Sequence, residues 1–281
     1  MTDIRTLQHL SPQELYEAFN LAFFDYKRSW TRNEFENMLQ RRGYSAAHSF
    51  GAFEGKQLVS FILNGCGRLN NRKAAYDTGT GTIAEYRGKG LTREIFKMCE
   101  SKLKAEGFEI YVLEVLQDNA KAISIYKNTG FEISREFNYY VHAAPAITIV
   151  KNPDAKCRTL QLAEIAEWQP ILDSAPSWQN NYESLDRARA KLKITGAYNG
   201  AELAGYGIIE PSSGDIPQVY VRKEFRRRGI GSVILHELTQ RNNSALIRIL
   251  NTVADCESVN AFLAHHHIEI TGKQYEMLKA L

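Results

Sequence analysis

The sequence contains few cysteines and no long apolar run. Cys66, Cys99, Cys157 and Cys256 lie far apart, and no two of them form a CxxC pair. This spacing argues against a disulfide framework and predicts reduced thiols in a reducing compartment. No apolar run approaches the ~18 residues of a membrane span, and the first residues lack the apolar core of a secretory signal. We therefore expect a cytoplasmic protein with no membrane partner.

The sequence also has little excess of charge of either sign. Lysine and arginine number 35, aspartate and glutamate number 32, and the net charge is +3. So small an excess is not typical of a protein that binds nucleic acid or an acidic membrane over a broad face. We therefore expect no nucleic-acid partner, and any anion site must be local.

Metal-binding motifs are missing as well. The sequence has no HExxH, and its adjacent histidines, His265–His267, do not have metal-ligand spacing. Neighbouring side chains at a helix end point apart and cannot converge on one ion. The run predicts a helix end at the surface, and we expect no metal.

The sequence does contain an internal repeat. Four pairs of segments match in the same order, and the offset between partners shrinks from 153 to 137 residues, as small loop deletions would cause. The pairs are IRTLQHL (4–10) with CRTLQLA (157–163), GAFEGKQLVSF (51–61) with GAYNGAELAGY (196–206), RGKGLT (87–92) with RRRGIGS (226–232), and GFEI (130–133) with HIEI (267–270). Because 281 residues suit two domains, we predict two copies of one fold, 1–145 and 156–281, joined near 142–156.

Both copies have the same predicted order of elements. A strand is followed by helices, strands, a helix, a strand, a helix and a last strand, which indicates an α/β fold with a mixed sheet of the α+β kind. In the first copy, Ser11, Thr31 and Asn119 are suited to cap helices. A turn at Glu54–Gly55 joins two strands, and a glycine-weakened strand covers 73–84.

The most informative stretch is Arg87-Gly88-Lys89-Gly90, which ends a strand and opens a helix. The first N–H groups of a helix have no partner within it, and glycine lets a ligand approach the backbone closely. Such a turn suits a phosphate or a diphosphate. Alone it is as well explained by a solvated basic turn, but Arg226-Arg227-Arg228-Gly229 repeats it in the second copy. Neither turn has the Lys-Ser/Thr of a Walker loop, and GTGT (79–82) leads into more strand rather than a Rossmann helix.

These residues resemble the GNAT N-acetyltransferase superfamily. Its coenzyme A diphosphate motif is Arg-x-x-Gly-x-Gly/Ala at a strand end that opens a helix. Its later N-x-x-A…Y…GF segment is similar to Asn119…Ala122…Tyr126…Gly130-Phe131. The resemblance covers nearly all of both copies. It implies two tandem GNAT acyltransferase domains that use acetyl-CoA (coenzyme A) and transfer its acetyl group by direct attack of a small-molecule or peptide amine.

The resemblance also implies the site residues. The hydroxyl of Tyr126 would lie near the thioester sulfur as a general acid, where the residue alone would more readily be taken for core packing. The residues implied to contact the cofactor are Thr82, Ile83, Arg87, Gly88, Lys89, Gly90, Leu91, Thr92 and Asn119 in the first copy, and Tyr220, Val221, Arg226, Arg227, Arg228, Gly229, Ile230, Gly231 and Ser232 in the second.

The two copies depart from the family pattern at different places. Thr92 stands where the family has glycine or alanine, although its N–H remains. The second copy keeps the full cofactor motif but has Cys256 in place of the asparagine and Leu263 in place of the tyrosine. The first copy is therefore expected to be catalytic. The alternatives are catalysis by the second copy alone and a non-catalytic acyl-CoA sensor or scaffold.

The general base is less clearly marked. Asp77 and Asp215 lie on the strands that lead to the two glycine turns, where the family often carries a carboxylate, and Glu114 lies on the next strand. An ordinary paired carboxylate would look the same at any of these positions.

The acceptor side is marked only by aromatic residues. Phe24, Asp25, Tyr26 and Trp30 are expected to border it in the first copy, as is SWQNNY (177–182) in the second. An amphipathic helix packed on the sheet explains the same pattern. Neither the acceptor nor the oligomeric state follows from the sequence.

Overall fold

The computed structural model describes residues 2–25, 30–143 and 155–281. The chain forms two compact units: unit 1 comprises Met1–Ser134 and Glu276–Leu281, and unit 2 comprises Arg135–Tyr275. Most of the predicted join lies outside the described residues. The segments 1–145 and 156–281 remain a prediction about the repeat, because the compact units exchange parts of the last strand of each segment.

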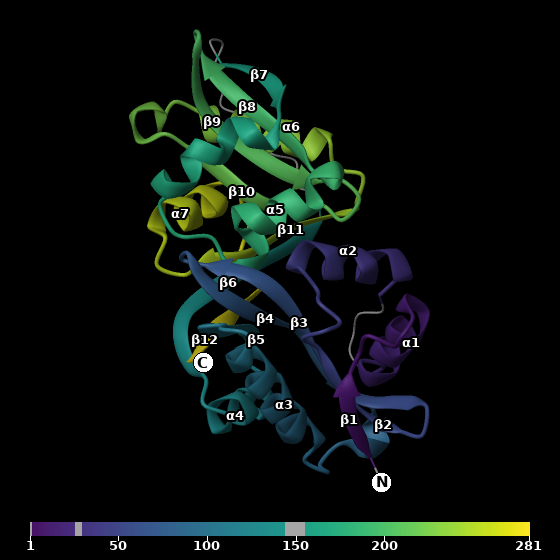
Figure 1. The fold of residues 1–281 in the computed structure, drawn as a ribbon. Helices are drawn as coiled ribbons and strands as arrows, with labels where there is room; N and C mark the ends of the chain where they lie inside the picture. The colour runs from purple at the N-terminus through teal and green to yellow at the C-terminus, as the bar shows by residue number, and fades with distance from the viewer. Residues whose placement is uncertain (1, 26–29, 144–154) are drawn as a thin grey trace. The chain divides into compact units, whose positions relative to one another are not determined.

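Unit 1 is a mixed sheet with helices on both faces (Figure 1). Antiparallel pairing joins the first four strands, and β5 then runs parallel to β4. The strands, in sheet order, are β1 (Asp3–Thr6), β2 (Phe50–Glu54), β3 (Gln57–Leu69), β4 (Arg72–Thr82), β5 (Ile110–Leu116) and the end of β12 (Gly272–Ala280). The helices are α1 (Pro12–Ala22), α2 (Arg32–Arg42), α3 (Leu91–Ala105) and α4 (Ala120–Asn128), with the short η1 (Ala84–Tyr86) before α3.

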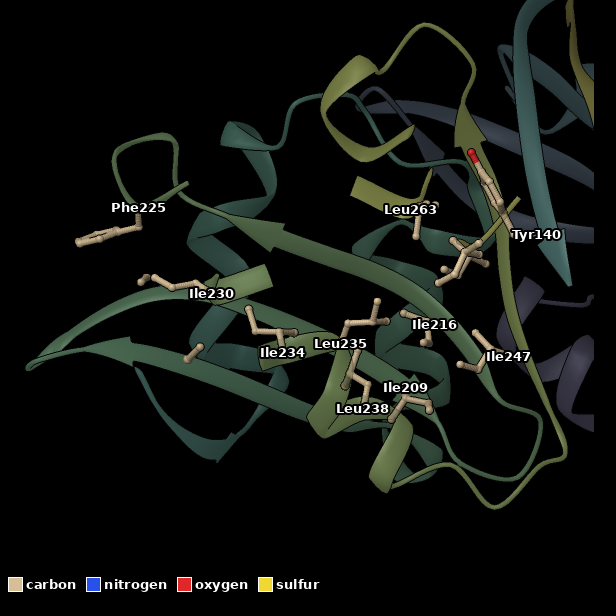
Figure 2. Packing of buried hydrophobic residues seen from close by; sticks show 14 residues of the cluster. Tyr140, Ile209, Ile216, Phe225, Ile230, Ile234, Leu235, Leu238, Ile247 and Leu263 are labelled. Atoms are coloured by element: carbon tan, nitrogen blue, oxygen red, sulfur yellow. The ribbon is translucent and has the colours of Figure 1, made fainter. Parts of the chain in front are cut away.

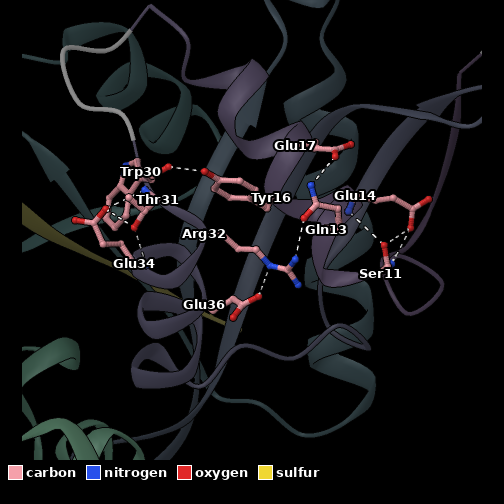
Figure 3. Close-up of polar contacts among 10 residues, drawn as sticks. All are labelled: Ser11, Gln13, Glu14, Tyr16, Glu17, Trp30, Thr31, Arg32, Glu34 and Glu36. Carbon is pink, nitrogen blue, oxygen red and sulfur yellow. Dashed lines mark hydrogen bonds and ion pairs between the residues drawn. The ribbon is translucent and has the colours of Figure 1, made fainter.

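The first two helices begin where the sequence predicts. Ser11 and Thr31 each accept from the backbone N–H three residues on, and a glutamate at that position bonds back to the cap, as Figure 3 shows. These capping boxes satisfy N–H groups that would otherwise lack partners. The two helices are also tied together, since the Tyr16 hydroxyl donates to the Trp30 carbonyl at 2.7 Å.

Unit 2 repeats this architecture, with one change in its first helical region. That region forms the 3-10 segment η2 (Leu162–Ile171) instead of the predicted α-helix. Pro170 lies inside it and cannot donate a backbone hydrogen bond. The strands, in sheet order, are β6 (Glu132–Ala143), β11 (Leu246–Val253), β10 (Asp215–Val221), β9 (Glu202–Glu210), β8 (Lys193–Asn199) and β7 (Ala155–Leu160). The remaining helical segments are η3 (Trp178–Asn180), α5 (Tyr182–Ala188), η4 (Arg189–Lys191), η5 (Lys223–Phe225), α6 (Ile230–Gln240) and α7 (Glu257–His265).

The core of unit 2 forms around α6, the helix that opens at the second glycine turn. Ile230, Ile234 and Leu238 recur at four-residue spacing and belong to one buried cluster with Ile209 and Ile247 of the strand region (Figure 2). Burial of this apolar stripe fixes α6 on the strands. The first turn of α6 is thereby held in place by the packing of the rest of the helix.

The last strand of each repeat is shared between the units. Unit 2 begins at Arg135, three residues into β6, whereas the final residues of β12, Glu276–Leu281, belong to unit 1. There Met277 is fully buried, and the Lys279 ammonium donates to Glu100 and to the Thr129 carbonyl, both at 2.6 Å. The fold of unit 1 therefore includes six residues that follow all of unit 2 in the sequence.

Candidate functional site

The two glycine turns have the same backbone. Gly90 and Gly229 are the N-caps of α3 and α6, with φ of 77° in both. One residue after the arginine that begins each motif, Gly88 has φ 78° and Arg227 has φ 63°. A Cβ added at Gly88 or Gly90 would meet no atom within 4 Å. We name these turns with the first turns of their helices socket 1 (87–92) and socket 2 (226–231).

Both sockets offer backbone donors in open space, which fits a diphosphate. The early N–H groups of a helix lack internal partners, and a left-handed glycine before them aims those groups outward. Lys89 is exposed beside socket 1 and lies 4.4 Å above the Tyr86 ring. Arg227 and Arg228 are exposed beside socket 2. Leu91 and Ile230 are buried and anchor their helices.

The first arginine of each motif points away from its socket. Arg87 Nε donates to the Thr82 carbonyl at 3.0 Å, and its two Nη atoms bond Asp25 at 2.5 and 2.9 Å. Arg226 Nε donates to the Val221 carbonyl at 2.9 Å. Its Nη2 lies 2.8 Å from Asp173. Both guanidiniums thus have partners within the protein, and the role of these two arginines in cofactor binding stays a prediction.

Side chains in the first helical turns differ between the sockets. The Thr92 hydroxyl lies 3.3 Å from the Thr82 hydroxyl, which in turn lies 2.7 Å from that of Ser60. At the matching place in socket 2, a Cβ on Gly231 would approach the Phe262 ring to 3.0 Å. A side chain at Gly231 would therefore crowd the Phe262 ring of α7.

Two predicted contact residues are occupied within the protein. Ser232 is buried and its hydroxyl lies 3.0 Å from His266 Nε2. Asn119 is the N-cap of α4, accepting from the Ala122 N–H at 3.1 Å. The prediction that the histidine run lies at the surface is wrong for His266, which is buried, and burial lowers its pKa. The remaining predicted contacts, Ile83 and Tyr220, are buried next to the strand ends.

A β-bulge marks the strand that leads to socket 1. Leu63 pairs with Gly79 and Asn64 with Asp77, so Thr78 is an extra residue on β4. The parallel register with β5 reaches only Tyr76, although β4 continues to Thr82. Bulges re-aim side chains and are common beside active sites. Here the bulge places Asp77 where β4 leaves β5.

Asp77 is buried with a perturbed charge. Burial raises its pKa to about 6. Four groups partly offset this rise by favouring the ionised form: the Thr80 hydroxyl at 2.6 Å, the Gly79 N–H, the Arg42 charge and the Tyr126 hydroxyl. Two candidates that the sequence separates by a strand and a helix are thus brought together in unit 1.

The ring of Tyr126 is fixed by aromatic neighbours. It lies edge-on to Phe96, with centroids 5.9 Å apart and planes at 89°, and edge-on to Phe131 at 6.0 Å. Glu114, the other base candidate, accepts from the Tyr76 hydroxyl at 2.9 Å. Of the predicted residues, Asp77 and Tyr126 therefore form the pair best placed for proton transfer.

The raised pKa of Asp77 predicts a pH-dependent stability. The unfolded side chain loses its proton near 3.8 but the folded one near 6, so its contribution is complete below about pH 4 and is lost as the pH rises through 6. Between about pH 4.5 and about pH 7.5, urea unfolding should show a free energy of unfolding that falls by about 2 kcal/mol more in the wild type than in Asp77→Asn. Equal falls in both proteins would contradict the assignment.

The matching positions in unit 2 are apolar. Counting back from Arg226 as from Arg87, the residue that matches Asp77 is Ile216, and Leu263 stands against Tyr126; both are buried. By the same count Asp215, the base candidate of the second copy, matches Tyr76. Asp215 is buried at the start of β10. Its backbone register partners are Glu210 on β9 and Arg248 on β11.

Unit 2 nevertheless contains a cavity beside socket 2. It has a volume of about 100 Å³. It lies between β10 and β11, beyond the point where Asp215 and Arg248 are register partners. It is lined by 172–176, by Asn180, by 216–220, by 249–253, and by Val259, Phe262 and Leu263 of α7. The lining has no acid–base pair like the one in unit 1.

A glutamine fills the neighbouring part of unit 2. Gln218, which stands against Gly79, is buried and accepts from the Tyr206 hydroxyl at 2.7 Å. Its amide donates to the Asn180 carbonyl at 2.7 Å, and Gln169 bonds the same side chain. The side of β10 that faces η2 is therefore closed by a polar network.

The aromatic stretch of unit 1 is partly described. Tyr26 lies outside the described residues. Trp30 packs edge-on against Phe19 at 6.0 Å, whereas Phe24 is 87 % exposed and Asp25 bonds Arg87. Of the described residues predicted to border the acceptor site, Trp30 is therefore packed against α1, whereas Phe24 and Asp25 are exposed.

No helix within residues 2–25, 30–143 and 155–281 is long and apolar enough to cross a membrane. Over the same described parts of the chain, no group of three or more His, Cys, Asp or Glu side chains is placed to hold a metal ion. The expectations of no metal and no membrane partner stay predictions.

Comparison with known proteins gives matches of sequence and of fold. The sequence model of the Acetyltransferase (GNAT) family matches residues 13–131. N-alpha-acetyltransferase 30 of Schizosaccharomyces pombe is 30% identical over 73 residues, which is 26% of this chain. The match spans about half the length of that relative, 49%.

Solved structures extend the likeness to the whole chain. A tandem GNAT protein from the clavulanic acid biosynthesis pathway has a TM-score of 0.73 at 14% identity, over 100% of this chain and 98% of that one. A GCN5-related N-acetyltransferase from Sphaerobacter thermophilus has a TM-score of 0.72 at 12% identity, over 99% and 95% of the two chains. At these identities the likeness is one of fold. Residues 13–131 therefore match the Acetyltransferase (GNAT) family in sequence, and the chain along its length has the fold of a tandem GNAT protein.

Proposed function

We propose that unit 1 is an N-acetyltransferase that moves the acetyl group of acetyl-CoA to a primary amine. The observation that carries the proposal is the convergence of Asp77 and Tyr126 at the bulge of β4, close in the chain to socket 1. Unit 2 has Ile216 and Leu263 at the same two positions. This contrast favours catalysis by unit 1 over catalysis by unit 2.

The two residues suffice for the proton transfers of a direct attack. The amine nitrogen bonds the acetyl carbon, the carbon–sulfur bond breaks, and the sulfur leaves as a thiolate. Asp77, ionised above about pH 6, accepts the proton that the amine loses. Tyr126 gives a proton to the sulfur, and return of a proton from Asp77 to Tyr126 restores both groups. Holding the amine beside the thioester supplies much of the remaining rate.

The residues of socket 1 would bind the diphosphate of acetyl-CoA. The N–H groups from Gly88 to Thr92 are the proposed donors, with Lys89 as the nearby exposed cation. Each of these donors is a backbone N–H group or a solvent-exposed side chain, so binding of the diphosphate would need no rearrangement of the core. The amine acceptor is proposed to be a small molecule or a peptide. The peptide class has added support, because the matched relative is named an N-alpha-acetyltransferase.

A second function is proposed for unit 2: it binds an acyl-CoA without turning it over. Socket 2 and the cavity between β10 and β11 support binding. The closed network around Gln218 and the missing acid–base pair argue against an acceptor amine there. In this arrangement, unit 2 is a sensor or a structural partner of unit 1.

Matched charge variants of the sockets test this division of roles. Asparagine and aspartate both tolerate the left-handed backbone of Gly90 and Gly229, and they differ by one negative charge. Gly90→Asp should lower acetyl-CoA turnover about 100-fold or more relative to Gly90→Asn, because the carboxylate repels the diphosphate. Gly229→Asp and Gly229→Asn should turn over alike. The assay is release of free thiol with a panel of small amines and peptide N-termini.

Calorimetry with coenzyme A separates the outcomes. We expect two binding sites in the wild type and one in either aspartate variant. Loss of turnover only in Gly229→Asp would assign catalysis to unit 2. Binding without turnover on any amine of the panel would support a sensor in place of an enzyme.

A further inference from the structure

A second repeated motif lies outside the sockets. Asp-x-x-x-Ser-Trp occurs at 25–30 and again at 173–178, and the separation of 148 residues lies between those of the flanking repeats. Each copy follows the first helical segment of its unit: α1 ends at Ala22 and η2 ends at Ile171. The aspartate therefore has the same place in both units, although the residues around it differ.

In unit 1, the aspartate holds the arginine of the socket motif. The Asp25 carboxylate accepts from both Nη atoms of Arg87, at 2.5 and 2.9 Å. The same guanidinium donates to the Ala22 carbonyl at 2.9 Å and to the Thr82 carbonyl at 3.0 Å. A bidentate pair is the geometry in which an Arg–carboxylate contact is strongest. The Arg87 guanidinium lowers the pKa of Asp25 to about 2.

In unit 2, the arrangement recurs with different surroundings. Asp173 lies 2.8 Å from Arg226 Nη2, and Arg226 Nε caps the Val221 carbonyl at the end of β10. Asp173 also accepts from the Ser258 hydroxyl at 2.7 Å, which ties it to the first turn of α7. Two units with little sequence in common thus join the same two places by the same pair of residues.

The pair connects the two sides of the proposed site. One end, Asp25, opens the segment between α1 and α2. The other end, Arg87, grips the last carbonyl of β4 and is the first residue of socket 1. Because the guanidinium is occupied by Asp25 and two carbonyls, it serves the turn by holding its shape rather than by contacting an anion.

We infer that Asp25 is a positioning residue for cofactor binding. It acts through Arg87 to fix the backbone of socket 1, and it anchors the segment that follows α1 to that socket. Asp173 does the same for socket 2. The inference deepens the function proposed above, since it assigns the arginine of the motif to the turn and gives the aspartate a role.

The test uses single and double variants of the full chain. Asp25→Asn should weaken coenzyme A binding at one of two calorimetric sites about fivefold, because one charge-assisted pair is lost. Arg87→Gln should weaken it similarly, and the double variant should be no weaker than either single one. Asp25→Glu should restore part of the loss. Asp173→Asn, the matched variant of unit 2, should weaken binding at the other site and leave the first site at its wild-type affinity.

Hydrogen exchange supplies a readout that needs neither ligand nor turnover. The amides of 88–92 should exchange faster in Asp25→Asn than in the wild type, while those of 229–232 should not change. Wild-type binding at both sites in Asp25→Asn, with unchanged exchange at 88–92, overturns the inference. If the wild type itself gives no heat with coenzyme A, the proposed function fails, and the exchange comparison still decides the role of Asp25.

Discussion

Tyr126→Phe should lower kcat for acetyl transfer by about 10²- to 10³-fold, with little change in the KM for acetyl-CoA. The ring contacts with Phe96 and Phe131 do not involve the hydroxyl, so phenylalanine keeps the packing. What is lost is the proton donor for the leaving sulfur. Single-turnover kinetics measure the chemical step directly, and Tyr198→Phe on β8 of unit 2 is the matched control.

Asp77→Asn completes this prediction, because it should separate activity from stability. Turnover should fall by a similar factor, and the rise of kcat/KM through about pH 6 should disappear. At neutral pH, however, the variant should unfold less readily, since a buried charge has been removed. The double variant with Tyr126→Phe should be little slower than either single one, as expected of residues that act as a unit. Full activity in both single variants would remove the pair from the mechanism.

The second large effect concerns the end of the chain. Deletion of Glu276–Leu281 should destabilise unit 1 by more than about 5 kcal/mol and abolish its activity. The deletion removes the buried Met277 side chain, leaves Glu100 and the Thr129 carbonyl without Lys279, and removes the second part of β12, the strand next to β5. Thermal unfolding and coenzyme A calorimetry measure the two consequences.

Single substitutions on the same strand should lower the stability of unit 1 by smaller amounts. Met277→Ala should cost about 2–5 kcal/mol and Met277→Leu less than about 1.5 kcal/mol, because the second change keeps the buried volume. The site in unit 2 should still bind coenzyme A in the truncated chain. A truncated protein that melts like the full one would show that unit 1 does not depend on β12.

Local features of the fold could be predicted from the sequence. Caps at Ser11, Thr31 and Asn119 were readable because a cap depends on a few neighbouring residues. The helix openings at Gly90 and Gly229 followed from the repeat. The 3-10 character of η2 was signalled by Pro170, inside a region predicted to be helical.

The site was less predictable, since it depends on tertiary packing. The position of Asp77 relative to Tyr126 depends on how β4 and α4 pack, and the bulge at Thr78 beside Asp77 is marked by no local pattern. Asp215 was a poor match for Asp77, and counting from the arginines would have revealed it. The turn of Arg87 and Arg226 toward Asp25 and Asp173 was missed, although the repeated Asp-x-x-x-Ser-Trp motif was a usable signal.

The sharing of β6 and β12 has a consequence for biosynthesis. The residues that complete unit 1 leave the ribosome only after the whole of unit 2 has been made. Until then, the edge of the unit 1 sheet at β5 is uncovered, and an uncovered sheet edge is prone to pairing with other chains. In a molecule built in this way, unit 1 is completed only after unit 2 has been synthesised, and a chain caught before that point is a natural client for chaperones.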